Sequence, residues 1–145
     1  MKALFLIFFI FLCHLGFAQE PKNEVKAIVI KLFKAIQEAD SAGVQSVFMP
    51  EAIMQTILID NDNQNTVRKE SVSRFASSVG AQKPGALNEI IEFETIKIDL
   101  PLAFVWTPYQ FYFNSTFSHR GVNAFCLIQT ATGWKIQYII DTRKK

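Results

Sequence analysis

The stretch Leu102–Thr142, LAFVWTPYQFYFNSTFSHRGVNAFCLIQTATGWKIQYIIDT, decides the fold. Apolar and aromatic residues recur along it, and two short turn-forming segments, Asn114-Ser115 and Ala131-Thr132-Gly133, divide it. Side chains of a β-strand point alternately to its two faces, and turns this short join neighbouring antiparallel strands. The stretch therefore predicts three consecutive antiparallel strands, over residues 102–113, 116–130 and 133–142.

The middle strand contains the unusual segment FSHRGVNAF, residues 117–125. Alternation places five of its residues on one face: Phe117, His119, Gly121, Asn123 and Phe125. Tyr109, Phe111 and Phe113 share one face of the preceding strand, which the turn brings alongside. Together they predict an aromatic wall with a polar patch, which either lines a cavity or faces solvent or a partner subunit.

Two residues of these strands break the regular pattern. A glycine inside a strand marks a bend or a close approach, and the bend is the favoured role of Gly121. Pro108 lacks a backbone N–H, so it predicts an edge position or a bulge beside Trp106. The alternation of Trp134 with Ile136 predicts a core role for that tryptophan.

The first half of the chain has mostly helical periodicity. Apolar residues at i, i+3, i+4 and i+7 predict a helix from about Asn23 to Ala39, with Asn23 able to cap it. The remaining predicted elements are a short helix over 44–48, a strand over 52–59, a turn over 60–65, a helix over 70–79 and a strand over 89–100. This order predicts one α+β domain over residues 19–145, with two to three N-terminal helices packed on a curved, mainly antiparallel sheet.

Residues 1–18 have the features of a cleaved signal peptide. Lys2 supplies a positive start, an apolar run follows, and Gly16-Phe-Ala18 offers small residues at the cleavage site. A membrane anchor is less favoured, because a spanning helix needs roughly 20 apolar residues. We therefore expect an exported protein, periplasmic or secreted, that is not held in a membrane after cleavage before Gln19.

Composition narrows the classes of partner. The formal net charge is only +2 with no basic tract, which disfavours nucleic acid as a partner. After cleavage Cys126 is the only cysteine and His119 the only histidine, so an internal disulfide is excluded and a metal site lacks ligands. No glycine-rich phosphate loop is present, and no cofactor is expected.

Several segments resemble one family. They are Trp106-Thr-Pro-Tyr109, Phe111-Tyr112, Phe117–Phe125, Gly133-Trp-Lys-Ile136 and Ile140-Asp-Thr-Arg143. They resemble the secreted bacterial "lumazine-binding" branch of the nuclear transport factor 2-like (SnoaL-like) superfamily, over essentially the whole of residues 19–145. Arg120 departs from that branch, in which a small or sulfur-containing residue is common beside the histidine.

The resemblance implies a cone: a curved sheet wrapped around a long N-terminal helix, enclosing an apolar cavity. The superfamily includes isomerases, cyclases and dehydratases as well as proteins without catalysis, so the fold alone leaves function open. The residues that would line the ligand cavity are Trp106, Tyr109, Phe111, His119 and Asn123.

Asp141 and His119 are the candidate catalytic residues. Asp141 follows two apolar residues near the end of the last strand, so it could act as a general base in the mouth of the cone. The favoured alternative is an ion pair with Arg143 or Arg120.

Three functions are compatible with these residues. The favoured one is a non-catalytic, exported protein that binds a small apolar or aromatic molecule. The second is an isomerase- or dehydratase-type enzyme that uses Asp141, His119 or Tyr109. The third is a dimeric interaction module whose sheet face, near Arg120, binds a second copy.

Overall fold

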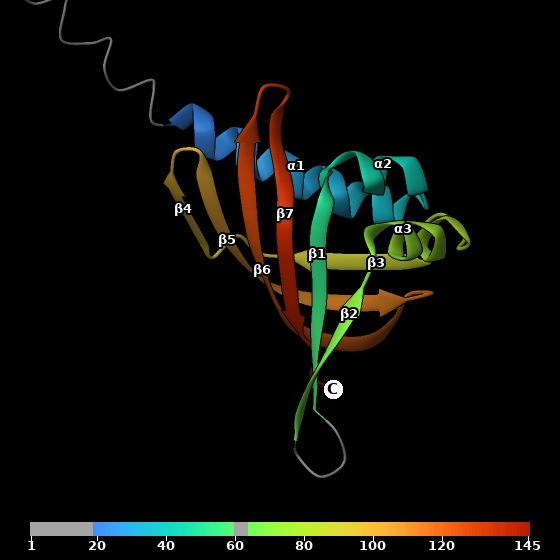
Figure 1. Cartoon of the computed structure of the whole chain (residues 1–145). Helices are drawn as coiled ribbons and strands as arrows, with labels where there is room; N and C mark the ends of the chain where they lie inside the picture. Colours follow the sequence, from blue (N-terminus) through green and yellow to red (C-terminus); the bar gives the residue numbers. More distant parts are fainter. Residues whose placement is uncertain (1–18, 60–63) are drawn as a thin grey trace, which may run out of the picture.

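A curved sheet wraps around a long helix in the computed structural model, which describes residues 19–59 and 64–145 (Figure 1). In these residues the helices are α1 (Gln19–Gln37), α2 (Ser41–Ser46) and α3 (Val72–Gly80). The strands are β1 (Phe48–Ile59), β2 (Asn65–Glu70), β3 (Leu87–Ile91), β4 (Thr95–Asp99), β5 (Leu102–Phe113), β6 (Thr116–Thr130) and β7 (Gly133–Thr142). The predicted α+β class is confirmed, while the signal-peptide prediction lies outside the described residues.

The sheet is mixed and strongly bent. Its described strands run in the order β2-β1-β7-β6-β5-β3, with β4 pairing with β5 beyond the end of β3. The β1–β7 pair is parallel and the other pairs are antiparallel. The three predicted strands of the meander are present with the predicted bounds.

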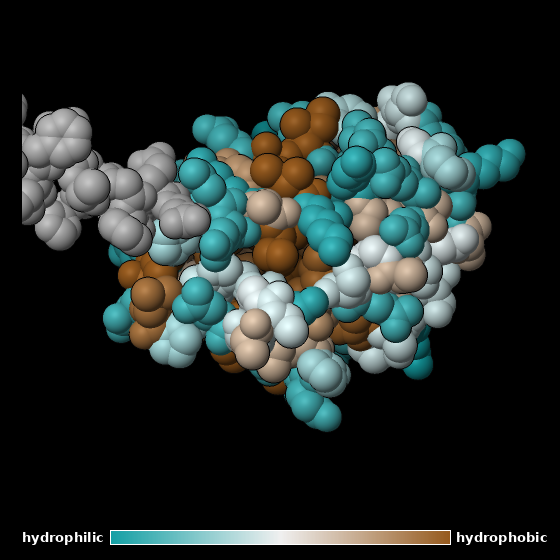
Figure 2. Space-filling view, turned by 90° about the horizontal axis from the view of Figure 1, so that it is seen from above, coloured by the Kyte–Doolittle hydropathy of each residue, from teal (hydrophilic) through white to brown (hydrophobic). Residues whose placement is uncertain are grey.

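The core lies between the sheet and α1. Val25, Val29, Leu32 and Ile36 recur on one face of the helix and are buried. Phe33 meets the ring of Phe125 on β6 edge-on, at 6.2 Å between ring centroids. Seen from above, the outer surface of the molecule has a central band of hydrophobic side chains with hydrophilic ones on both sides (Figure 2).

Short local signals set the two smaller helices. The Asp40 carboxylate accepts a hydrogen bond from the Gly43 N–H and caps α2, and Ser71 caps α3 in the same way through the Arg74 N–H. With these caps, α2 begins at Ser41 and α3 begins at Val72. The sequence had predicted that the two helices begin at residues 44 and 70. In the structure α1 is already helical at Gln19.

Two strand predictions are wrong. The exposed strand β2, NTVRKE, was missed, because its polar residues have no apolar alternation. Only its ends had been assigned, Asn65 to the turn over 60–65 and Glu70 to the helix over 70–79. The single strand predicted over 89–100 is divided into β3 and β4 by residues 92–94.

Pro108 explains that division. It lies inside the sheet, and its carbonyl accepts a hydrogen bond from the Glu92 N–H at 2.9 Å. The N–H that proline lacks would point to the same side, so the ladder is interrupted there. Pro108 therefore does not lie at the sheet edge as predicted, and the interruption that it causes is the break between β3 and β4, which pair with β5.

Candidate functional site

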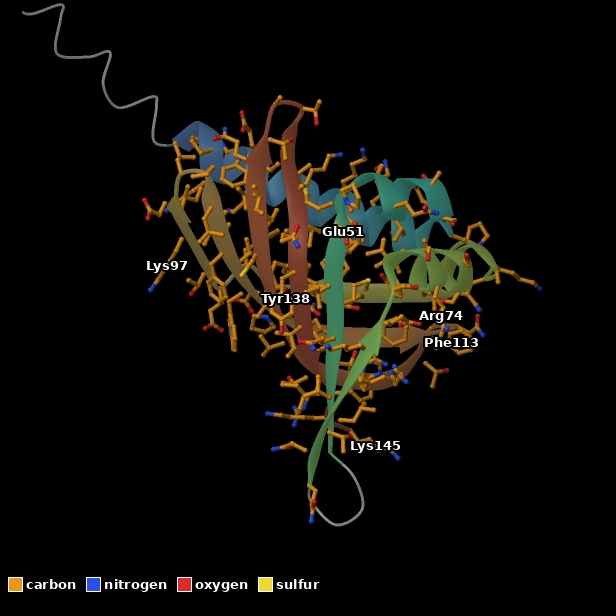
Figure 3. All side chains as sticks on the ribbon, in the orientation of Figure 1. Glu51, Arg74, Lys97, Phe113, Tyr138 and Lys145 are labelled. Atoms are coloured by element: carbon orange, nitrogen blue, oxygen red, sulfur yellow. The ribbon has the colours of Figure 1, made fainter. Side chains whose placement is uncertain are left out.

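A cavity of about 390 Å³ lies between the concave face of the sheet, α1 and α3. Its apolar wall includes Leu32, Phe33, Ile36, Phe75, Phe111 and Phe113. Its polar side chains include Thr56, Arg68, Glu70, Glu89, Tyr109, His119, Asn123, Asp141 and Arg143. Phe113 stands at the end of β5, on the side of the sheet where α3 lies (Figure 3).

Four of the five residues predicted to line the cavity do so: Tyr109, Phe111, His119 and Asn123. The polar patch of β6 therefore faces inward. Trp106 is the exception, and its assignment to the cavity is corrected. It lies an odd number of positions from Tyr109, so it points to the outer face, beside Phe104.

A bulge changes the face of Phe117. Phe111 pairs with His119, but Tyr112 pairs with Phe117, which leaves Ser118 as an extra residue. Phe117 therefore lies on the outer face against Tyr112, instead of sharing the inner face with His119. The cross-strand partner of Phe113 is Thr116.

Asp141 is held by three donors. Thr56 Oγ1 donates to Oδ1 at 2.6 Å, and Arg143 Nε donates to Oδ2 at 3.1 Å. Tyr109 OH also lies 3.1 Å from Oδ2, and its single proton is shared between this oxygen and the Thr142 carbonyl oxygen at 2.9 Å. The favoured ion pair with Arg143 is therefore present, and the carboxylate side chain is only 12% exposed. Burial first, and then the charge of Asp141, raise the pKa of Tyr109, so the phenol remains a donor.

Glu89 is one of the site residues that the sequence analysis missed. Asn123 Nδ2 donates to Glu89 Oε1 at 2.7 Å, across 34 residues of chain. Burial raises the pKa of Glu89 to about 7; the nearby Asp141 charge adds to this, whereas the Asn123 hydrogen bond and Arg143 oppose it. Only its alternation with Leu87 and Ile91 could have placed it on the inner face.

His119 packs between aromatic rings. Its ring lies 4.9 Å from that of Phe111 and 5.8 Å from that of Tyr109, edge-on to the latter. Burial, and then the charge of Arg143, lower the pKa of His119, so the imidazole is neutral at pH 7. Nδ1 is 3.0 Å from Ser118 Oγ.

Gly121 allows a close approach. A Cβ atom there would lie 1.8 Å from the Thr142 carbonyl oxygen and 3.0 Å from Tyr109 Cε1. Gly121 is the cross-strand partner of Tyr109, and the tyrosine OH reaches the Thr142 oxygen at 2.9 Å. Because Gly121 has no side chain, the Tyr109 ring can pack against it and reach Thr142. The sequence analysis had favoured a bend as the role of Gly121, and this close approach is a further role.

Arg120 lies on the opposite face of the sheet from the cavity. Its backbone pairs with Lys144, and both residues line a second hollow of about 450 Å³, the outer groove, with Ile90, Pro108, Gln110 and Val122. Ile90 is 56% exposed there. A dimer through this face stays a prediction.

The described residues show neither a metal cluster nor a membrane-spanning helix. Within residues 19–59 and 64–145, no three His, Cys, Asp or Glu side chains are grouped so that they could hold a metal ion. No helix in the same residues is long and apolar enough to cross a membrane.

The stability of the fold should depend on pH through Glu89. Its pKa in the folded chain, about 7, is above its ordinary value of 4.5, so the folded state binds this proton more tightly. The resulting stability is present below pH 4.5 and is lost as the pH rises to 7, by at most about 3 kcal/mol. Glu89→Gln should therefore stabilise the chain by about 1–3 kcal/mol at pH 8 and change little at pH 4.5.

Denaturant unfolding between pH 4.5 and 8 measures this difference. Glu92→Gln, at an exposed neighbouring carboxylate, is the matched control and should follow the native chain. Parallel pH profiles for the native chain and Glu89→Gln would contradict the assignment.

Comparisons with solved structures identify similar folds. A nuclear transport factor 2-like protein of unknown function from Shewanella baltica OS155 matches with a TM-score of 0.67 at 16% identity, over 89% of this chain and 97% of that one. One from Silicibacter pomeroyi DSS-3 matches with a TM-score of 0.68 at 10% identity, over 88% and 98%. A domain of unknown function with a cystatin-like fold from Nostoc punctiforme PCC 73102 matches with a TM-score of 0.67 at 13% identity, over 87% and 78%.

Sequence comparisons add no relative. No protein-family model matches the chain, and no curated protein is significantly similar to it. Identities this low show a shared fold and leave the ligand and activity to the site itself.

Proposed function

Since this chain has the nuclear transport factor 2-like fold, we propose that it is an exported protein that binds a small apolar or aromatic molecule in the cavity of its cone. The carrying observation is the cavity itself. Its volume lies within the range of ligand sites, roughly 300–1,000 Å³. Apolar side chains from α1, α3 and β5 line one part of the cavity, and polar side chains line much of the rest. The site can therefore bury an apolar molecule and orient it by hydrogen bonds.

The contacts of Asp141 favour binding over catalysis. Three donors occupy three of the roughly four acceptor positions of the Asp141 carboxylate, and such bonds stabilise its ionised form and make it a weaker base. Among the described residues no hydrogen bond joins Asp141 to His119. An acid–base role for this pair therefore stays a prediction.

The proposal includes export and the family branch. Residues 1–18 supply the features of a signal peptide, and the motifs between Trp106 and Arg143 support the "lumazine-binding" branch. N-terminal sequencing of the protein recovered from outside the cytoplasm should begin at Gln19; an intact Met1 there would contradict cleavage.

A melting screen tests ligand binding. A compound that binds the folded chain at 100 times its Kd should add about 2.7 kcal/mol of stability and raise the melting temperature. Phe111→Ala removes an aromatic wall of the cavity and should abolish that shift for a hit from an aromatic and steroid panel. The shift of each variant is measured from the melting temperature of the same variant without ligand.

Phe117→Ala is the matched control. It removes an identical ring from the same hairpin, but from the outer face, so the ligand-dependent shift should persist. Flat melts across the whole panel, or equal loss in both variants, would contradict a ligand site in the cavity.

A further inference from the structure

We propose that the ligand of this cavity is a monocation, a protonated amine on an aromatic or other apolar frame, with Glu89 as its counter-ion. This inference rests on the proposed function and specifies the chemical class of the ligand. Three features of the described residues carry it: the open oxygen of Glu89, the charge balance of the lining, and the aromatic rings beside the carboxylate.

Glu89 has an oxygen to offer. Among the described residues its one side-chain donor is the Asn123 amide, which occupies Oε1. Oε2 is left to the cavity that the residue lines. A half-buried carboxylate whose second oxygen has no protein donor is partly desolvated, so a ligand that brings a donor there replaces the hydration that was lost.

The charge balance of the described lining points to a cation. It carries two arginines, Arg68 and Arg143, and three carboxylates, Glu70, Glu89 and Asp141. Arg143 is paired with Asp141, whereas in this described lining no ion pair is formed between Arg68 and Glu70, which lie on the same face of β2. With Glu89 ionised, the five charges sum to one net negative charge, which a single positive charge on the ligand neutralises.

Aromatic rings lie where that cation would bind. Phe111 is the cross-strand partner of Glu89, and His119 packs against the Phe111 ring. Tyr109 is two residues from Phe111 on the same face of β5. A cation within about 6 Å of such rings gains further stabilisation, and it gains more when it is desolvated.

Binding of the cation should be linked to the loss of a proton from Glu89. The charged and titratable groups that face it are Asp141 from β7, Arg143 just after β7, His119 from β6, Tyr109 from β5, and Arg68 and Glu70 from β2. The lining contributed by α1 and α3 is Leu32, Phe33, Ile36, Phe75, Ser78 and Val79, none of which titrates. With the pKa of Glu89 at about 7, its ionised fraction rises about tenfold from pH 6 to pH 8.

Three indole compounds of matched shape provide the test: tryptamine is the cation, tryptophol the neutral analogue and indole-3-acetate the anion. Titrations of the chain 19–145, followed by calorimetry or amide NMR shifts, should show tryptamine binding at least about tenfold more tightly than tryptophol at pH 8. The affinity for tryptamine should rise about tenfold from pH 6 to pH 8, while that for tryptophol should not. Indole-3-acetate should be the weakest.

Two variants separate the charge from the shape of the site. Glu89→Gln should remove the preference for tryptamine over tryptophol and its pH dependence, while tryptophol still binds. Glu92→Gln should keep both. The pH profile of the native chain gives the same information without any variant.

The inference and the function that it rests on fail differently. Equal or tighter binding of tryptophol or indole-3-acetate in the cavity would overturn the cation and leave the ligand site standing. No binding of any of the three would overturn the cation, and together with flat melts across the screening panel it would overturn the ligand site as well.

Discussion

Phe125→Ala should lower the free energy of unfolding by about 3–5 kcal/mol, the usual loss when a fully buried phenylalanine is truncated. Phe125 is completely buried at the centre of β6, and its ring meets that of Phe33 on α1. Truncation would leave a cavity between the sheet and the helix that the surrounding strands cannot close. Denaturant unfolding followed by tryptophan fluorescence measures the change.

Phe117→Ala is the control at the other end of the same nine-residue segment. Phe117 is 47% exposed and lies beyond the bulge, so its truncation should cost less than about 1 kcal/mol. Similar losses in the two variants would contradict the placement of the core on the Phe125 side of the segment.

Gly121→Ala should lower the free energy of unfolding by about 3 kcal/mol, the upper part of the range for overpacked sites. The added methyl group would lie 1.8 Å from the Thr142 carbonyl oxygen, which belongs to the backbone of β7. That residue is also tied to its neighbours, since Tyr109 OH donates to its oxygen and the Val122 N–H donates to its side chain. The strands β6 and β7 therefore cannot separate to make room for the methyl group without breaking these hydrogen bonds.

The same substitution should disturb the ligand site. Tyr109 Cε1 is 3.0 Å from the new Cβ, so the ring must shift and its hydrogen bond to Asp141 must lengthen. The control is Ser118→Ala, at an exposed residue of the same strand, which should change the free energy of unfolding by no more than about 0.5 kcal/mol. A Gly121→Ala variant as stable as Ser118→Ala would show that the close approach is not required.

The meander was predictable because its signals are local. Alternation over Leu102–Thr142 and two short turns set three strands, and the alternation correctly grouped His119, Gly121 and Asn123 on one face. A bulge has no local signal of this kind, because the extra residue is defined by the partner strand. Phe117 was therefore placed on the wrong face.

The missing parts of the site depend on contacts between distant residues. Glu89 stands between apolar residues in a strand, and its partner Asn123 becomes a neighbour only when the sheet forms. The exposed edge strand β2 has a polar sequence, so its pairing with β1 defines it more than its own pattern does. Arg68 and Glu70 belong to β2 and line the cavity, and the sequence did not indicate this position for either residue.

The central claim is that the concave face of the sheet, and not its outer face, binds a small molecule. An amide NMR map of the chain 19–145, titrated with a hit from the melting screen, tests it most directly. We predict shift changes gathered at Glu89, Phe111, His119 and Asn123 around the cavity. Changes gathered instead at the outer groove, around Ile90, Gln110, Arg120 and Val122, would contradict the account.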